Sequence, residues 1–333
     1  MGKLVAALKT LASVLLISAV HFMPAHAVTL GASPLATYID DEGEPARLNA
    51  IMQEAFSRMA TELELTVMRR AFLGSGLLSG KLDGEYAFQD LDSQHDKFVY
   101  SEPYLPLYLY ATSKSQSVTE IRLIPHLQDS RVAIENRFGN TDRFRLLKDI
   151  KWSRNPTTYD AFRQLADERA PYLISTRLLI DELNRLLRDD GEELLHFSAA
   201  PLISSGLRIS LSKKLPDAQQ TIASFNETIA QMHKDGTFNQ LLGVAWLSKD
   251  IDGDGTAEYI SSADVAHAKI EPGILALAFS LDGVPANDSS AFIIDGTRYA
   301  DWQAAAGALA EVTPSLRPSL LDPEVYKRMI RRW

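Results

Sequence analysis

Residues 97–115 read KFVYSEPYLPLYLYATSKS, and the rest of the chain is organised on either side of them. The overlapping stretch DLDSQHDKFVYSEPY, at 90–104, has the pattern of the end of one strand, a short turn and the start of a second strand. Strands and helices alternate from residue 28 up to this stretch, and a second alternating series begins after residue 115. This alternation predicts an α/β fold.

The two series divide into separate expected elements. Apolar residues at helical spacing across 48–59 predict a helix with one face in the core. Within 217–242, Asp217 is expected to cap a second helix, which Gly236 ends. The remaining expected elements are strands at 28–33, 63–71, 131–135 and 170–176, helices at 160–168 and 177–189, a helix, turn and strand across 74–88, and strands within 193–216.

The first 27 residues have the organisation of an export signal. Lys3 and Lys9 accompany the apolar run Leu11–Val20, and AHA at 25–27 is a small-x-small cleavage pattern. The run is short for a membrane span, no other stretch approaches its length, and no cysteine marks a lipoprotein. We expect a protein exported to the periplasm, beginning near Val28, with no stable membrane insertion after cleavage. The alternative is an uncleaved N-terminal anchor.

Charge and cysteine content narrow the classes of partner. The formal net charge is −9, and it becomes −11 without the two lysines of the signal. An acidic chain of this kind is a poor candidate for binding nucleic acid or an anionic membrane surface. Because cysteine is absent, disulfides contribute nothing and stability has to come from packing.

Three motifs, in this order, resemble segments of the amino-acid-type (family 3) periplasmic solute-binding proteins. GKLDG at 80–84 is similar to the turn before that family's ligand strand. Residues 97–115 are similar to its segment with Ser-x-Pro-Tyr and to the strand that follows into the hinge. IASFNETIAQMHKDGTFNQLL at 222–242 is similar to its terminal helix, so the resemblance covers about 28–243.

The resemblance implies two α/β lobes joined by two crossover segments, near Tyr110–Ser113 and Phe197–Ile203, which close on a ligand by hinge motion. It also implies a ligand site between the lobes and an ABC permease or a sensor as partner. The implied divisions are a signal peptide at 1–27, lobe 1 at 28–110 and 197–243, lobe 2 at 111–196, and a C-terminal extension at 244–333.

Both groups that hold a free amino acid in this family are missing. The resemblance places the arginine that grips the ligand carboxylate at Gln94, and the aspartate that holds the ammonium near Ser175 and Thr176. An amide cannot form the charge-assisted fork of an arginine. Leaving a carboxylate and an ammonium unpaired in a closed site costs several kcal/mol. We therefore expect a small polar solute other than a free α-amino acid.

Other residues remain as candidates for contacting such a solute. Tyr38 follows the first strand, where the family often places an aromatic ring over its ligand. The loop around Arg137 precedes an expected helix, whose backbone N–H groups can receive an anion. The full candidate set is Tyr38, Phe88, Gln89, Asp90, Gln94, Arg137, Gly139, Asn140, Thr141 and Thr176.

The segment DIDGDGTAE at 250–258 has the composition of a cation-binding loop. Asp250, Asp252 and Asp254 alternate so that a tight turn at Gly255 brings their side chains together, and Thr256 adds a carbonyl. An EF-hand needs glutamate at position 12, where the chain has Ser261. With Glu258 at position 9, the segment looks more like the calcium loops of FG-GAP-type hairpins. We expect a structural Ca²⁺ site; the alternative is an acidic turn without metal.

The residues after this loop lie outside the resemblance. AFIIDGTRYADW at 291–302 predicts a hairpin with an Asp-Gly turn, and 301–312 a short helix. The basic end KRMIRRW either folds onto the acidic body or contacts a partner.

An enzyme is not expected, because GxSxG, HExxH and a cysteine nucleophile are all absent. Two alternatives stay open beside the solute-binding protein. One is a dehydratase-like enzyme that uses His95 with Asp90 or Asp92, since dehydratases occur on this fold. The other is a scaffold or sensor whose ligand site has degenerated.

Overall fold

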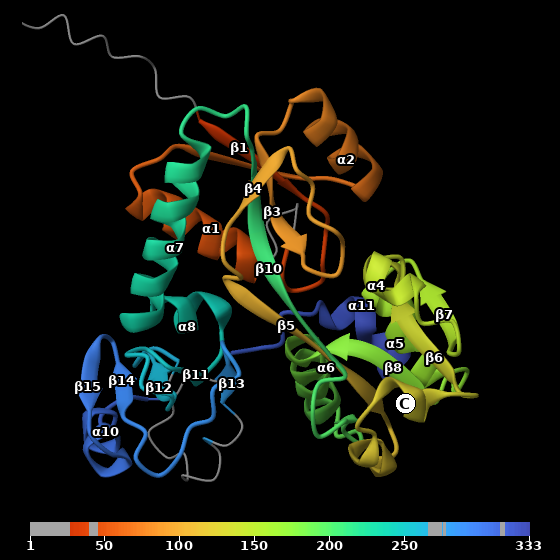
Figure 1. The fold of residues 1–333 in the computed structure, drawn as a ribbon. Coiled ribbons are helices and arrows are strands. Elements are labelled where there is room, and N and C mark those ends of the chain that lie inside the picture. The colour runs from red at the N-terminus through yellow and green to blue at the C-terminus, as the bar shows by residue number, and fades with distance from the viewer. Residues whose placement is uncertain (1–26, 40–45, 266–274, 276–277, 314–316) are drawn as a thin grey trace, which may run out of the picture.

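The computed structural model describes residues 27–39, 46–265, 275, 278–313 and 317–333. The expected export signal at 1–27 lies almost wholly outside the described residues. The chain forms two α/β lobes joined by crossover strands, followed by a smaller unit built on a second sheet (Figure 1).

One large sheet runs through both lobes in the order β2-β1-β3-β10-β5-β8-β6-β7, with β4 on β10 and β9 on β5. Strands β1 to β3 are mutually parallel on one side, β6 to β8 are parallel on the other, and the antiparallel pair β5–β10 joins them. The strands are β1 Val28–Ala32, β2 Leu63–Val67, β3 Gly84–Gln89, β4 Phe98–Tyr100, β5 Leu105–Ser113, β6 Arg131–Glu135, β7 Lys151–Asn155, β8 Tyr172–Thr176, β9 His196–Phe197 and β10 Ile203–Ser212.

Four helices belong to lobe 1: α1 Arg47–Arg58, α2 Arg70–Ser79, α7 Ala218–Lys234 and α8 Thr237–Leu242. The apolar stripe expected within 48–59 is buried in α1, which packs on α7 and α8. The expected cap of α7 is wrong, because Asp217 has a left-handed backbone (φ 57°) and its side chain makes no capping hydrogen bond. The expected strand at 63–71 is also too long, since α2 begins at Arg70.

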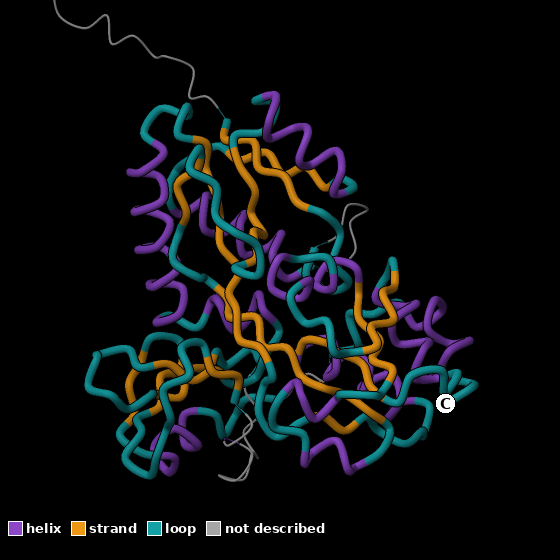
Figure 2. The backbone as a smooth tube through the Cα atoms, turned by 45° about the vertical axis from the view of Figure 1, so that its right-hand side comes forward, coloured by secondary structure: helices purple, strands orange, loops and turns teal. Residues whose placement is uncertain are grey.

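Lobe 2 contains α3 Asn136–Gly139, α4 Asp142–Arg145, α5 Thr158–Ala166, α6 Arg177–Asp189 and the 3₁₀ turns Gln116–Glu120 and Ile124–Leu127. Helix α6 has the bounds expected from its amphipathic pattern and buries five leucines, Ile180 and Glu182. Figure 2 shows the strands of both lobes with helices around them.

The chain after α8 forms a second sheet in the order β13-β11-β12-β14-β15. The expected hairpin at 291–302 is confirmed as β14 and β15, joined by Asp295 and Gly296, which both have positive φ. A last helix then packs against α5 and α6 of lobe 2. The elements are β11 Leu247–Lys249, β12 Glu258–Ser261, β13 Phe279–Ser280, β14 Phe292–Ile294, β15 Thr297–Tyr299, α10 Trp302–Ala308 and α11 Pro323–Ile330.

Candidate functional site

The candidate residues of the two lobes lie at the carboxyl ends of four strands, two from each parallel set of the sheet. Tyr38 follows β1, Gln89 ends β3, Arg137 follows β6 and Thr176 ends β8. Ligands of open α/β sheets bind at such strand ends. The sheet therefore brings residues that are far apart in the sequence to one junction between the lobes.

Tyr38 and Thr176 meet directly across this junction. The Tyr38 hydroxyl donates a hydrogen bond of 3.0 Å to Thr176 Oγ1, and both side chains are buried. Burial raises the pKa of Tyr38 to about 12, although the hydrogen bond to Thr176 and the charge of Arg47 oppose this. Thr176 Oγ1 also accepts from the Leu179 N–H and caps α6. Tyr38 and Thr176 therefore link lobe 1 directly to lobe 2.

The residues at the end of β3 have different surroundings. The Phe88 ring lies 4.8 Å from that of Tyr100. Asp90 accepts a 2.6 Å hydrogen bond from Arg208 Nε, so a guanidinium already balances its charge. Gln94 is exposed. His95 pairs with Asp96 at 2.9 Å, so the structure does not assemble the acid–base pair of His95 with Asp90 or Asp92.

The loop of lobe 2 expected to receive an anion instead faces groups of lobe 1. Arg137 Nη2 donates to Ser33 O at 2.8 Å and also to Pro34 O. The Asp142 N–H, at the first turn of α4, donates to the Asp92 carboxylate at 3.1 Å. A carboxylate of the chain itself therefore lies where an external anion was expected.

Two other members of the predicted set in this loop take no part in this contact. Asn140 is exposed, whereas Thr141 is fully buried and its hydroxyl donates to Phe138 O at 2.6 Å. The junction is reinforced beside them, where the Arg143 N–H donates to Leu91 O at 3.2 Å.

Five enclosed polar atoms at this junction make no hydrogen bond with any described residue. Most buried polar groups in proteins are hydrogen-bonded, and exceptions mark sites that a water, ion or ligand completes. The five atoms are Ser33 Oγ and Thr37 Oγ1 after β1, Gln89 Oε1 at the end of β3, Arg137 Nε in α3 and Ser205 Oγ in β10.

Glu85 in β3 is a charged residue of the junction that the sequence interpretation missed. Burial raises its pKa to about 7, against the opposing charges of Arg137 and Arg70, while the charge of Asp92 raises it further. The signal available in the sequence was a glutamate inside the otherwise apolar strand GEYAF. Glu135 at the end of β6 is also buried; burial raises its pKa against the charge of Arg137 and the hydrogen bond from Thr158.

Two hollows lie outside this junction. One of about 10 Å³ lies inside lobe 2 beside Glu135, room for about one water. The other, of about 110 Å³, lies between α5 and α11 and is lined by Arg163, Arg328 and Arg332 with two further residues.

The acidic loop between β11 and β12 brings Asp250, Asp252 and Asp254 together. One carboxylate oxygen from each lies within 4.8 Å of the others, so this exposed triad could hold a metal ion. Asp250 also accepts from the N–H groups of Gly253 and Gly255, which shapes the turn.

The other two residues predicted for this metal site lie at the end of the loop. Thr256 is half-buried, and its N–H donates to Asp254 Oδ1 at 2.8 Å. Glu258 is buried and lies apart from the triad, where it pairs with Arg298 at 2.8 Å and accepts from the Ile251 N–H. Arg298 also lies 3.3 Å from Asp252.

Solved structures share this fold. The chain is similar to the GluR0 ligand-binding core in complex with L-glutamate, at a TM-score of 0.54 and 10% identity over 66% of this chain and 97% of that one. It is also similar to the BvgS VFT2 domain of Bordetella pertussis, at a TM-score of 0.51 and 15% identity over 65% of this chain and 91% of that one. A mutant of ArgBP from T. maritima is similar at a TM-score of 0.50 and 18% identity, over 64% of this chain and 93% of that one.

The three likenesses show that about two thirds of the chain has the α/β fold of periplasmic-binding-protein-like cores. Comparison with protein-family models and with curated protein sequences gives no match. Within the described residues, none of the helices has both the length and the apolar character needed to cross a membrane.

Proposed function

We propose that this protein captures a small polar solute between its lobes in the periplasm and presents it to an ABC permease or a sensor. The observation that carries the proposal is the set of five enclosed polar atoms without a hydrogen bond to a described residue, at the carboxyl ends of β1, β3 and β6 and in β10. One of them, Arg137 Nε, also lies 3.8 Å from the Glu135 carboxylate. A solute with both donor and acceptor groups satisfies them, since the set includes the carbonyl of Gln89 and the Nε–H of Arg137. The proposal includes the division of the chain into lobe 1 at 28–110 and 197–243, lobe 2 at 111–196 and the C-terminal extension at 244–333.

The same geometry argues against a free α-amino acid as the solute. Gln94 is exposed, and the Thr176 hydroxyl is engaged by Tyr38. Asp92 occupies the N–H of Asp142 and would repel the ligand's α-carboxylate. Neither of the two positions that the resemblance assigns to the charges of a zwitterion therefore carries a charged group that could hold one.

Native mass spectrometry of protein purified from its own periplasm tests the proposal, followed by thermal unfolding with candidate solutes. We expect a co-purified polar small molecule and no shift in melting temperature with common L-amino acids. A solute at a hundred times its dissociation constant adds about 2.7 kcal/mol of stability. The change Gln89→Leu should abolish the solute's effect, whereas Gln94→Ala at an exposed position should not.

Two results would contradict this assignment. The first is a clear stabilisation by one free amino acid that is lost in Arg137→Gln. The second is the absence of any bound solute together with unchanged stability in Gln89→Leu. The second result would favour a scaffold or sensor that closes without ligand, a candidate supported by the direct lobe-to-lobe bonds of Tyr38 and Asp92.

We also propose that the Asp250, Asp252 and Asp254 triad binds Ca²⁺ as a structural ion. Three carboxylates this close repel one another, and a hard cation with oxygen ligands relieves the repulsion. The carbonyl of Thr256 would complete the set, and Glu258 would join it only by leaving Arg298.

A chelator should lower the melting temperature and loosen the 247–262 segment. The double change Asp252→Asn and Asp254→Asn should remove this sensitivity, while Asp301→Asn, which only alters the cap of α10, should retain it. If calorimetry detects no heat of binding at millimolar calcium, the loop is an acidic turn without metal.

A further inference from the structure

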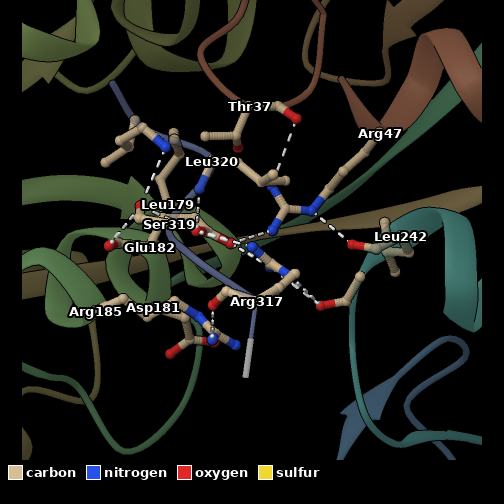
Figure 3. A network of polar contacts seen from close by, with 12 residues as sticks. Thr37, Arg47, Leu179, Asp181, Glu182, Arg185, Leu242, Arg317, Ser319 and Leu320 are labelled. Carbon is tan, nitrogen blue, oxygen red and sulfur yellow. Dashed lines mark hydrogen bonds and ion pairs between the residues drawn. The ribbon is translucent and has the colours of Figure 1, made fainter. Parts of the chain in front are cut away.

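The end of the chain and both lobes meet at one buried carboxylate, Glu182 (Figure 3). Glu182 lies in α6 of lobe 2, and 1% of its side chain is exposed. Arg47, from the first turn of α1 in lobe 1, donates from Nη2 to Glu182 Oε1. Arg317, from the segment before α11, donates to the same oxygen at 2.5 Å.

Both arginines also hold the backbone at the end of α8 in lobe 1. Arg47 Nε donates to Leu242 O at 2.7 Å, and Arg317 Nη2 donates to Gly243 O at 3.1 Å. Each guanidinium therefore has one contact on lobe 2 and another on lobe 1. The planar fork of arginine suits such a bridge, because its donors point in fixed directions.

The other oxygen of Glu182 is satisfied by the residues that follow Arg317. Glu182 Oε2 accepts from Ser319 Oγ at 3.1 Å and from the Leu320 N–H at 2.8 Å. Burial alone would raise the pKa of Glu182, but the hydrogen bond from Arg317 and the charges of Arg47 and Arg317 lower it to about 2. The carboxylate is therefore ionised at neutral pH and binds all of these donors.

From this point to its last residue the chain lies on lobe 2. Helix α11 buries Tyr326, Met329 and Ile330 and packs against α5 and α6. The Trp333 indole N–H donates to Glu193 O at 2.8 Å, and Lys114 Nζ donates to Trp333 O at 3.0 Å.

The sheet that precedes this segment is attached to lobe 1. The buried Asn239 of α8 donates to Ile260 O at 2.8 Å, and Gln240 donates to Asp264 Oδ2 at 2.7 Å. The C-terminal extension thus has one end on lobe 1 and the other on lobe 2 (Figure 1).

We propose that the described parts of the C-terminal extension, residues 244–265, 278–313 and 317–333, act as a strap that holds the two lobes at a set spacing, with Glu182 as its attachment point and Arg317 as its positioning residue. Rotation of one lobe against the other separates Glu182 from the end of α8 and breaks the bridges of Arg47 and Arg317. The strap therefore favours the lobe arrangement of this structure whether or not a solute is present, and its role does not depend on which solute is bound.

The distance between two spin labels, one on each lobe, tests the strap in solute-free protein. The chain has no native cysteine, so Ser75→Cys in α2 and Lys148→Cys after α4 give two exposed label sites across the junction. With the wild-type strap we expect a narrow distance distribution from pulsed electron spin resonance. Arg317→Gln should broaden it and move population to longer distances.

Arg331→Gln is the matched control, since this exposed arginine of the same segment has no side-chain hydrogen bond or ion pair among the described residues. If Arg317→Gln does not fold, Ser319→Ala removes one Glu182 contact more gently and should shift the distribution in the same direction. The proposal is overturned if Arg317→Gln folds and gives the same distance distribution as the Arg331→Gln control. If Arg317→Gln does not fold, the same result for folded Ser319→Ala overturns it.

Discussion

Glu85 shows how one side chain can make the stability of the whole protein depend on pH. The usual glutamate pKa of 4.5 rises to about 7 at this position, mainly because the carboxyl is buried at the lobe junction. The folded state therefore binds a proton that the unfolded state has released between about pH 4.5 and pH 7. Stability contributed by this site is present below that window and is lost as the pH rises through it.

Glu85→Gln should accordingly stabilise the protein at pH 8, by on the order of 1–2 kcal/mol after allowance for partial solvent screening. The gain should vanish below about pH 4.5, where the wild-type carboxyl is protonated in both states. Urea unfolding across pH 4 to 8 measures the difference. Glu64→Gln, at an exposed carboxyl of β2, should give no such trend, and equal behaviour of the two variants would contradict the expectation.

At the same scale, the sequence carried no information on which side chains contact one another. The structure brings Tyr38, Gln89, Arg137 and Thr176 to strand ends at one junction, but their role in binding a solute stays a prediction. The sequence did not reveal that the Tyr38 hydroxyl would bind Thr176, because that contact spans 138 residues. Neither the family resemblance nor the spacing of residues predicts which side chains form hydrogen bonds with each other across the two lobes.

Among the elements, the loop between β11 and β12 has a feature that affects its proposed ion. Arg298 of β15 lies within 3.3 Å of Asp252 and 2.8 Å of Glu258, so a cation of the protein already neutralises part of the loop. An entering Ca²⁺ competes with this guanidinium for the same carboxylates.

Arg298→Gln should therefore tighten calcium binding, by roughly two- to fivefold, as expected when a partly exposed ion pair is removed. Calorimetric titration of both proteins gives the ratio of dissociation constants. Lys327→Gln, which only removes a contact with Glu324 on α11, serves as the control. Weaker binding in Arg298→Gln would mean that the arginine shapes the loop and does not compete with the ion.

Elements with a strong local pattern were predicted well. The bounds of α6 follow from its amphipathic sequence, and the β14–β15 hairpin from its Asp-Gly turn. Asp217 stands at the N-cap position of α7, but its backbone is left-handed instead of extended and its side chain makes no capping hydrogen bond. A cap depends on backbone dihedrals that residue type alone does not determine.

For the whole molecule, the resemblance was enough to predict two lobes and their crossovers, since three ordered motifs constrain the path of the chain. The position of the strap was beyond such reasoning. Its attachment joins Arg47, Glu182 and Arg317, and each arginine is 135 residues from the glutamate. In the sequence, nothing distinguishes this glutamate and these two arginines from ordinary surface charges; only the fold brings them together.

The pairing of β10 with β3 has a consequence for the order in which the protein folds. Strand β10 inserts between β3 and β5, and its Leu207 pairs with Gln89 across more than a hundred residues of intervening chain. Closing so long a loop is entropically costly, whereas β6, β7, α5 and β8 all lie within residues 131–176 and meet early. A chain interrupted before residue 203 can assemble the second lobe's strands, but it leaves β3 as an open edge, which is a template for aggregation.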